Sequence, residues 1–289
     1  MKYLHMKAIL ILAGILTSGI ASAAEPRTEK IKAFVSILPQ AYFVERVGGP
    51  YVDVDVLVVP GQSPATYEPT PKQMSKLGRS HVYFRIGVPF EKAFVPKISN
   101  TCKNLQIVDT RKGVPLRYFR KSKGSQVPDP HIWLDPKLVK IQAENICNAL
   151  VHSDPTHAKE YKGNLNSFHA DLDRVDAKIA TTLAPVKGSK FYAFHPAFGY
   201  FGDSYGLIQV AVEIEGKSPS ARQLTHLIKR AKMDRVKVIF LQPQFAKKHA
   251  ETVARAIGGA VVAINPLARD YLKNLEAMAA NLNKALSGR

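Results

Sequence analysis

The sequence of 289 residues predicts an α/β protein with two mostly parallel-sheet domains joined by one long, rigid helix. Three observations support this fold class. Segments rich in β-branched and aromatic residues alternate with segments of helical periodicity. Several helices begin where a capping residue precedes proline. A helical apolar pattern then continues for about thirty residues in the middle of the chain, with no proline beyond its first turn.

Eight segments have the composition and length of β-strands and are bounded by turn-forming residues. Four of them lie in the first half of the chain and four in the second: 32–37, 52–59, 81–87, 105–110, 190–194, 209–213, 236–241 and 260–264. A helical or loop segment separates each from the next. We therefore expect two parallel sheets flanked by helices.

Four helix starts have a capping residue followed by proline, which tolerates the first helical position because its missing N–H needs no partner there. They are Thr70 with Pro71, Asp135 with Pro136, Asp154 with Pro155, and Ser218 with Pro219. Residues 111–127, in contrast, show little periodicity and many basic, glycine and serine residues. This stretch predicts an exposed loop.

The central helix is predicted over residues 154–184 from apolar side chains spaced three or four residues apart. These side chains are Tyr161, Leu165, Phe168, Leu172, Val175, Ile179 and Leu183. At 1.5 Å per residue such a helix would run about 45 Å, long enough to pass along both domains. We therefore expect a rigid connection that allows little domain closure.

The N-terminus has the features of a cleavable signal peptide over residues 1–23. Lys2 and Lys7 precede an apolar run over 8–20, and small residues follow at 21–23. The run is too short to cross a bilayer comfortably, although an uncleaved anchor is an alternative. No cysteine follows for lipid attachment. We expect a free periplasmic protein with an N-terminal domain over 24–153, the linking helix over 154–184 and a C-terminal domain over 185–289.

The formal charge of +18 raises the question of nucleic-acid binding. The basic residues are scattered over predicted helix faces and one loop, and no nucleic-acid-binding motif is visible, so we expect no such partner. Cys102 and Cys147 could pair in an oxidising compartment. Their spacing in the sequence leaves open whether they form a disulfide.

Two histidines lie where ligands bind in open α/β sheets, beyond the carboxyl ends of strands or in loops before helices. His195 directly follows the predicted strand 190–194, and His131 lies in a proline-bounded turn before the helix that begins at Pro136. Neutral imidazole is a common zinc ligand, which favours a metal site in the interdomain cleft. Asp129 is expected either to orient His131 or to cap a turn, and Gln242 is a further cleft candidate together with Gln244.

Five motifs resemble those of the solute-binding proteins of zinc and manganese ABC importers, with the zinc-importer component most similar. They are 60–71 (PGQSPATYEPTP), 129–136 (DPHIWLDP), 194–198 (FHPAF), 215–224 (EGKSPSARQL) and 265–271 (NPLARDY). The resemblance runs from about Ile31 to the C-terminus. It implies a monomeric carrier, not an enzyme, that captures a divalent metal in the periplasm and delivers it to an inner-membrane ABC permease.

The resemblance places two metal ligands on His131 and His195 but alters the other two positions. The family usually has histidine where this chain has Ala65, and aspartate where it has Asn265. Three explanations stay open: other groups complete the shell around the histidines and Asn265, the site holds metal weakly or holds a different metal, or metal binding has been lost and the cleft serves another ligand or partner. The groups that could complete the shell are Gln62, Glu68, Glu215 and water.

Two imidazoles favour zinc as the transported ion over manganese or iron, because manganese is better served by carboxylate oxygens. Two rival functions differ in kind. An adhesin-like or non-metal ligand-binding protein could be built on the same fold. A metal-dependent hydrolase would need an open coordination position and a general acid or base such as Glu68 or Glu215.

Overall fold

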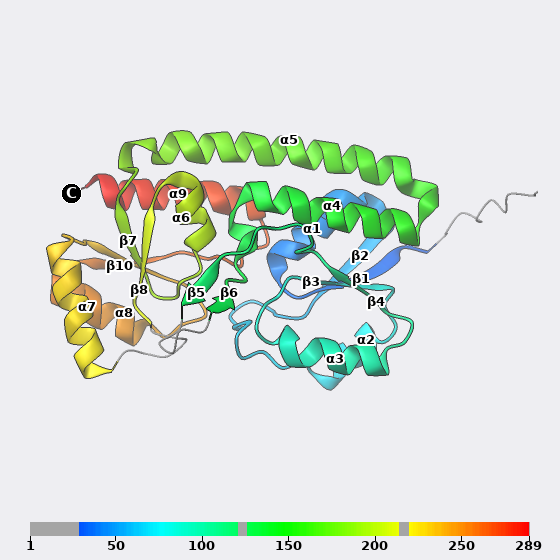
Figure 1. Cartoon of the computed structure of the whole chain (residues 1–289), viewed down its shortest axis with the longest axis horizontal. Coiled ribbons are helices and arrows are strands. Elements are labelled where there is room, and N and C mark those ends of the chain that lie inside the picture. Colours follow the sequence, from blue (N-terminus) through cyan, green and yellow to red (C-terminus); the bar gives the residue numbers. More distant parts are fainter. Residues whose placement is uncertain (1–28, 121–125, 214–219, 289) are drawn as a thin grey trace, which may run out of the picture.

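The computed structural model of the chain describes residues 29–120, 126–213 and 220–288. Over these ranges the chain forms a pair of α/β domains that lie side by side beneath one long helix (Figure 1). The predicted signal peptide, residues 1–23, lies outside them. No helix of the described ranges is both long and apolar enough to cross a lipid bilayer.

The first domain contains a four-stranded parallel sheet in the order β2-β1-β3-β4. Its strands are β1 (Ile31–Val35), β2 (Val52–Val56), β3 (Val82–Arg85) and β4 (Gln106–Asp109), connected through α1 (Leu38–Gly48), α2 (Pro71–Leu77) and α3 (Glu91–Thr101). The chain passes from β1 to the edge strand β2 and then returns past β1 to β3. The switch in direction therefore lies between the carboxyl ends of β1 and β3, where such sheets bind ligands.

The second domain repeats this arrangement, with a parallel sheet in the order β10-β9-β7-β8. Its elements are β7 (Lys190–Ala193), α6 (Gly199–Tyr205), β8 (Ile208–Ala211), α7 (Ala221–Met233), β9 (Val238–Leu241), α8 (Lys247–Ile257) and β10 (Ala260–Ala263). Here the switch lies between β7 and β9. Both sheets and the positions of all eight predicted strands are confirmed.

The long central helix is also confirmed. A 3-10 turn at Pro155–His157 leads into α5 (Ala158–Leu183), which ends in a second 3-10 turn. Of the predicted apolar side chains, all except the partly exposed Leu165 are buried. The helix lies against α4 (Pro136–Ser153) and α9 (Tyr271–Ser287) (Figure 1), and ion pairs add to this packing: Lys140 with Asp173 at 2.8 Å and Lys178 with Glu276 at 2.6 Å.

Two local predictions need correction. The expected loop over 111–127 contains part of an antiparallel hairpin, β5 (Tyr118–Arg120) with β6 (Gln126–Pro128). Three-residue strands are too short to leave a periodic pattern in the sequence, so composition alone suggested a loop. Ser218 and Pro219 lie outside the described residues, and α7 begins later, at Ala221, where Ser220 accepts a hydrogen bond from the Gln223 backbone N–H.

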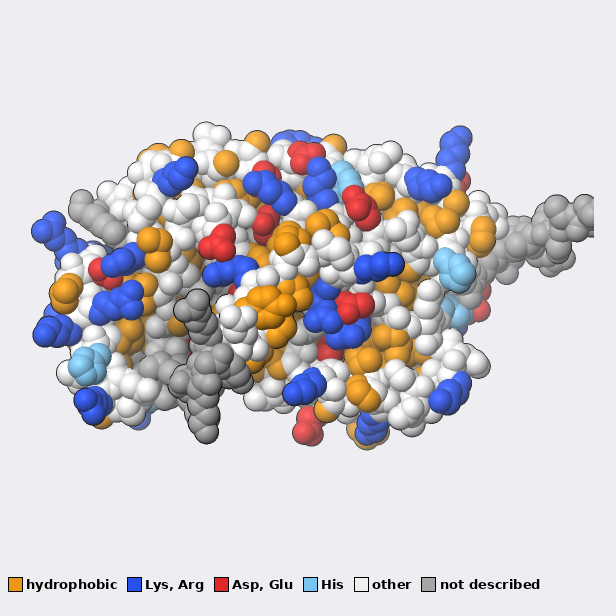
Figure 2. All heavy atoms as spheres, viewed as in Figure 1, with side chains coloured by type: hydrophobic (Ala, Val, Ile, Leu, Met, Phe, Trp, Pro, Cys, Tyr) orange, Lys and Arg blue, Asp and Glu red, His pale blue; other side chains and the backbone are white. Residues whose placement is uncertain are grey.

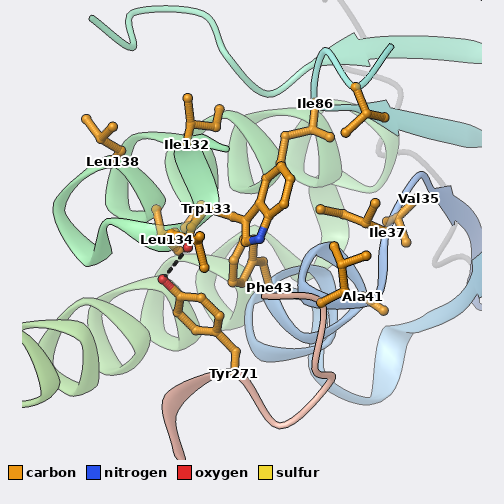
Figure 3. Close-up of a cluster of buried hydrophobic side chains, with 14 of the residues drawn as sticks. Val35, Ile37, Ala41, Phe43, Ile86, Ile132, Trp133, Leu134, Leu138 and Tyr271 are labelled. Atoms are coloured by element: carbon orange, nitrogen blue, oxygen red, sulfur yellow. Dashed lines mark hydrogen bonds between the residues drawn. The ribbon is translucent and has the colours of Figure 1, made fainter. Parts of the chain in front are cut away.

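The core between the domains is centred on Trp133, which is 1% exposed (Figure 3). Its indole N–H donates to the carbonyl of Pro266 at 2.7 Å, and its own carbonyl accepts from the Tyr271 hydroxyl at 2.6 Å. Phe43 and Ile86 from the first domain lie in the same cluster. This tryptophan therefore connects the first domain to the segment that leads into α9.

The cysteines are both free. Cys102 is partly exposed, whereas Cys147 is buried in α4, and burial raises the pKa of its thiol. The surface shown in Figure 2 carries Lys and Arg side chains spread over both domains and mixed with acidic ones. On this face no basic stripe of the kind used to follow a nucleic-acid backbone is visible.

Candidate metal site

His131 is held by the aspartate two residues before it. One carboxylate oxygen of Asp129 accepts from the backbone N–H of His131 at 3.0 Å and lies 2.7 Å from its ring Nδ1. Asp129 therefore both caps the turn and orients the imidazole. Burial lowers the pKa of His131, although the Asp129 carboxylate acts in the opposite direction. The ring is consequently neutral near pH 7 and able to ligate.

His195 is held at the switch point of the second sheet, two residues after β7. Gln242, which follows β9, accepts from the His195 N–H at 3.1 Å and donates to its carbonyl at 2.8 Å. The ring Nδ1 lies 2.6 Å from a carboxylate oxygen of Glu213, and the Phe245 ring stacks on the imidazole at 5.1 Å between centroids. Backbone, ring nitrogen and ring face of His195 are all fixed.

The free nitrogens of the two histidines converge, with Nε2 of His131 3.3 Å from Nε2 of His195. Since each Nδ1 faces a carboxylate, its hydrogen is assigned there, and both Nε2 atoms then present lone pairs. Two lone pairs at this distance repel unless a cation lies between them. Zn–N bonds of about 2.0–2.1 Å in tetrahedral geometry separate two ligand nitrogens by about 3.3–3.4 Å.

Both histidines open into a cavity of about 700 Å³ between the domains. Its wall includes polar groups such as Arg85, Arg111 and Gln244, and an apolar part formed by Phe119, Val127, Trp133, Phe245 and Leu267. Gln242 and Gln244, which were predicted as cleft residues, both belong to this wall. A bare ion would fill only a small part of such a volume.

A family model of the zinc-uptake complex component A, periplasmic (ZnuA), matches residues 34–285 of the chain. The chain belongs to the ZnuA family. A crystal structure of ZnuA is 38% identical with a TM-score of 0.85, covering 89% of this chain and 99% of that one. The high-affinity zinc uptake system protein ZnuA of Bacillus subtilis (strain 168) is 27% identical over 89% of this chain and 85% of its own length.

The chain is also similar to a protein named for another metal, the manganese ABC transporter substrate-binding lipoprotein PsaA of Streptococcus pneumoniae. It is 24% identical over 86% of this chain and 83% of its own length. Membership makes the protein an extracytoplasmic, metal-capturing substrate-binding component of an ABC importer, and not an enzyme, as the sequence predicted.

The structure places the remaining predicted ligands of this ZnuA-family protein less favourably than the histidines. Gln62 and Glu68 are exposed and do not belong to the described cavity wall. The side-chain oxygen of Asn265 accepts from the Leu267 N–H at 3.0 Å and so serves its own turn. Glu215 lies outside the described residues. In the described ranges, no cluster of three or more His, Cys, Asp or Glu side chains suited to a metal ion occurs.

Glu213 is the site residue that the sequence reasoning missed. It follows β8 directly after Val212 and is 5% exposed, so its side chain points inward at the carboxyl edge of the sheet. The rule that singled out His195, a polar residue just beyond a strand, applies equally to Glu213. From the sequence, Glu213 is predicted as the last residue of the strand 209–213, and the motif 215–224 that follows favours Glu215 instead.

A second layer of charge lies behind Asp129. Arg117 places its Nη1 3.8 Å from the second carboxylate oxygen of Asp129, and its Nε 3.0 Å from Asp203. Neither Arg117 Nη1 nor that Asp129 oxygen has a hydrogen-bond partner within the described residues. Gly199 makes room for the guanidinium, because a Cβ at position 199 would lie 1.5 Å from Nη1.

We expect Gly199→Ala to weaken zinc binding about tenfold, the lower end of what outer partners of metal ligands contribute. The added methyl group would displace Arg117 and leave the Asp129 charge without its neighbour. Calorimetric titration with zinc measures the effect. Gly163→Ala on α5, where no atom lies within 4 Å of the new methyl group, is the matched control. Equal zinc affinity in both variants would contradict a role for Arg117 in supporting the site.

Each of the two carboxylates behind the histidines should contribute more to zinc affinity than Arg117 does. Asp129→Asn and Glu213→Gln remove the negative charge that fixes the ring tautomer and increases ligand basicity, at nearly constant volume. We expect each to raise the dissociation constant for zinc 10- to 100-fold, roughly the range for such outer partners. Competition with a chromophoric chelator measures this. Unchanged affinity in Glu213→Gln would show that His195 does not ligate through Nε2.

Proposed function

We propose that this protein captures zinc in the periplasm through His131 and His195 and delivers it to an inner-membrane ABC permease. The observation that supports this most is the pair of facing Nε2 atoms, 3.3 Å apart, each backed by a buried carboxylate. A zinc-binding imidazole usually ligates the metal through one ring nitrogen and donates the N–H of the other to a carboxylate.

Zinc is the proposed cargo because both donors are imidazole nitrogens. Manganese favours carboxylate oxygens, and here the two nearest carboxylates, Asp129 and Glu213, face the other ring nitrogens instead. The manganese relative keeps manganese as the second candidate, with iron behind it. The remaining ligand assignments, Gln62, Glu68, Glu215 and Asn265, stay predictions.

The sequence and the family membership together support a proposal on export, assembly and partners. We propose that residues 1–23 direct export and are removed, that the carrier is monomeric, and that it has no nucleic-acid partner. In an ABC importer the permease receives its cargo from the substrate-binding protein, so we expect the permease to bind this carrier directly. The hydrolase alternative fails because the family consists of binding components, and the adhesin alternative is not favoured over metal capture by the family match.

The test is elemental analysis of the purified mature protein followed by calorimetric titration with zinc and with manganese. We expect one zinc per chain and a dissociation constant for zinc well below that for manganese. If the protein binds zinc, manganese and iron no more tightly than millimolar, metal capture at this site is excluded. Manganese binding tighter than zinc binding would leave metal capture standing and overturn the choice of ion.

A further inference from the structure

We propose that the cavity takes the metal together with a small polycarboxylate, which ligates the ion through one carboxylate and faces the basic wall of the first domain with another. This inference rests on the proposed metal site and adds a second ligand to it. Its basis is the composition, size and charge of the cavity among the described residues.

The first observation is the set of side chains that can donate to the metal ion. Among the described residues only the two imidazoles converge on one point, and no third His, Cys, Asp or Glu joins them. Zinc takes four ligands, and oxygen from a carboxylate is one of its ordinary partners. Asn265 is engaged in its own turn, and Ala65, which lies on the cavity wall, has no donor atom. Among the described residues, therefore, no further side chain fills the coordination positions on the cavity side.

The volume is the second observation. At about 700 Å³ the cavity lies within the range of roughly 300–1,000 Å³ that is typical of sites for small organic molecules. Phe119, Val127 and Leu267 give it an apolar side that would pack against a short carbon skeleton. A hydrated ion alone does not call for such a surface.

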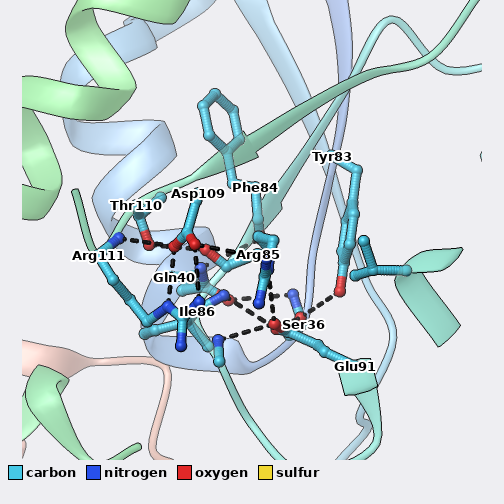
Figure 4. A network of polar contacts seen from close by, with 12 residues as sticks. Ser36, Gln40, Tyr83, Phe84, Arg85, Ile86, Glu91, Asp109, Thr110 and Arg111 are labelled. Carbon is cyan, nitrogen blue, oxygen red and sulfur yellow. Dashed lines mark hydrogen bonds and ion pairs between the residues drawn. The ribbon is translucent and has the colours of Figure 1, made fainter. Parts of the chain in front are cut away.

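The third observation is the charge of the cavity wall. Its described residues include the cations Arg85, Lys92 and Arg111 and one anion, Glu91. Glu91 is fully engaged, since its carboxylate accepts from Ser36 at 2.6 Å and from the Ile86 and Gly87 backbone N–H groups at 2.9 and 2.7 Å (Figure 4). It also accepts from Arg85 Nε at 3.3 Å, so part of the positive charge of the wall is already paired.

Asp109, which stands behind this wall, is shared between the two arginines, at 2.7 Å from Arg111 and 3.4 Å from Arg85 (Figure 4). With Asp109 counted, the group of three cations and two anions keeps one positive charge. The two charges of an arriving metal ion are balanced by Asp129 and Glu213 behind the histidines. A cavity that receives a cation while its opposite wall is positive is electrostatically completed by an anion.

The position of the basic wall agrees with the topology of the two sheets. Ser36 and Gly87 follow β1 and β3, so the basic wall lies at the switch point of the first sheet, and His195 lies at that of the second. Each switch point is where an open α/β sheet binds ligands. In this arrangement His131 of the first domain and His195 of the second hold the ion together, and the basic wall of the first domain faces the free end of the polycarboxylate.

Equilibrium dialysis of radiolabelled citrate against the mature protein, with and without one equivalent of zinc, tests the proposal. We expect about one citrate retained per chain only when zinc is present, and loss of both in His195→Gln. Lys92→Met should weaken citrate retention about tenfold at matched zinc occupancy, the effect of one lost charged contact. Lys97→Met, on the same helix but outside the cavity wall, is the control.

Ala65→His supplies an imidazole from the cavity wall and should make zinc affinity independent of citrate. Zinc bound at one per chain with no citrate retained overturns the polycarboxylate and leaves the metal site intact. Citrate retained equally without zinc overturns coordination to the ion. If zinc is bound neither with nor without citrate, the proposed metal capture itself fails.

Discussion

His195→Ala is expected to raise the dissociation constant for zinc by more than about 100-fold, and His131→Ala to do the same. Each substitution removes one of two converging nitrogens, and loss of a ligand should exceed the 10- to 100-fold cost of losing an outer partner. Zinc titration by calorimetry, with a chelator competition for the wild type, measures the change.

The matched control is His226→Ala, which removes an exposed imidazole on α7 outside the cavity wall. Because His195→Ala also leaves the buried carboxylate of Glu213 without its partner, His195→Gln serves as a second variant that keeps a donor near it. Circular dichroism verifies the fold of each. Retention of wild-type zinc affinity in both His195 variants would exclude this histidine as a ligand.

Trp133→Ala is expected to lower the free energy of unfolding by about 3–5 kcal/mol, the usual cost of deleting a large aromatic side chain from a core. The indole is 1% exposed and donates to the Pro266 carbonyl at 2.7 Å, so the substitution leaves both a cavity and an unpaired carbonyl. Denaturation with urea, followed by far-UV circular dichroism, measures the loss.

Trp133→Phe separates the two contributions, because it keeps most of the buried ring while removing the indole N–H. We expect it to cost about 1–3 kcal/mol through the unpaired Pro266 carbonyl and the smaller ring. A Trp133→Ala variant as stable as the wild type would mean that this cluster does not hold the first domain to the segment before α9.

The architecture could be predicted from the sequence because it depends on local signals that repeat. Parallel strands buried on both faces appear as short apolar runs, and a proline after a capping residue locates a helix start within one or two positions. The hairpin of β5 and β6 could not be predicted, since three-residue strands paired across a turn leave no periodic signal in the sequence. Its existence depends on tertiary context.

The site was only half predictable for a similar reason. His131 and His195 stand in distinctive local settings, a proline-bounded turn and a strand end. The partners that orient their rings differ in how far away they lie: Asp129 is two residues from its histidine, whereas Glu213 is eighteen residues from His195 and reaches it through the pairing of β7 with β8. No short motif records a contact of that kind.

The single helix α5 has a consequence for how the permease distinguishes a loaded carrier from an empty one. Because one uninterrupted helix packs on both α4 and α9, we expect the two domains to move little relative to each other, and the overall outline of the molecule to change little, when cargo arrives. We expect the change to lie in the electrostatic potential at the mouth of the cavity, which shifts with the charge of the bound species. The permease would then distinguish a loaded carrier from an empty one by the local charge at this mouth and by how well ordered the surrounding surface is. This discrimination would weaken as ionic strength rises.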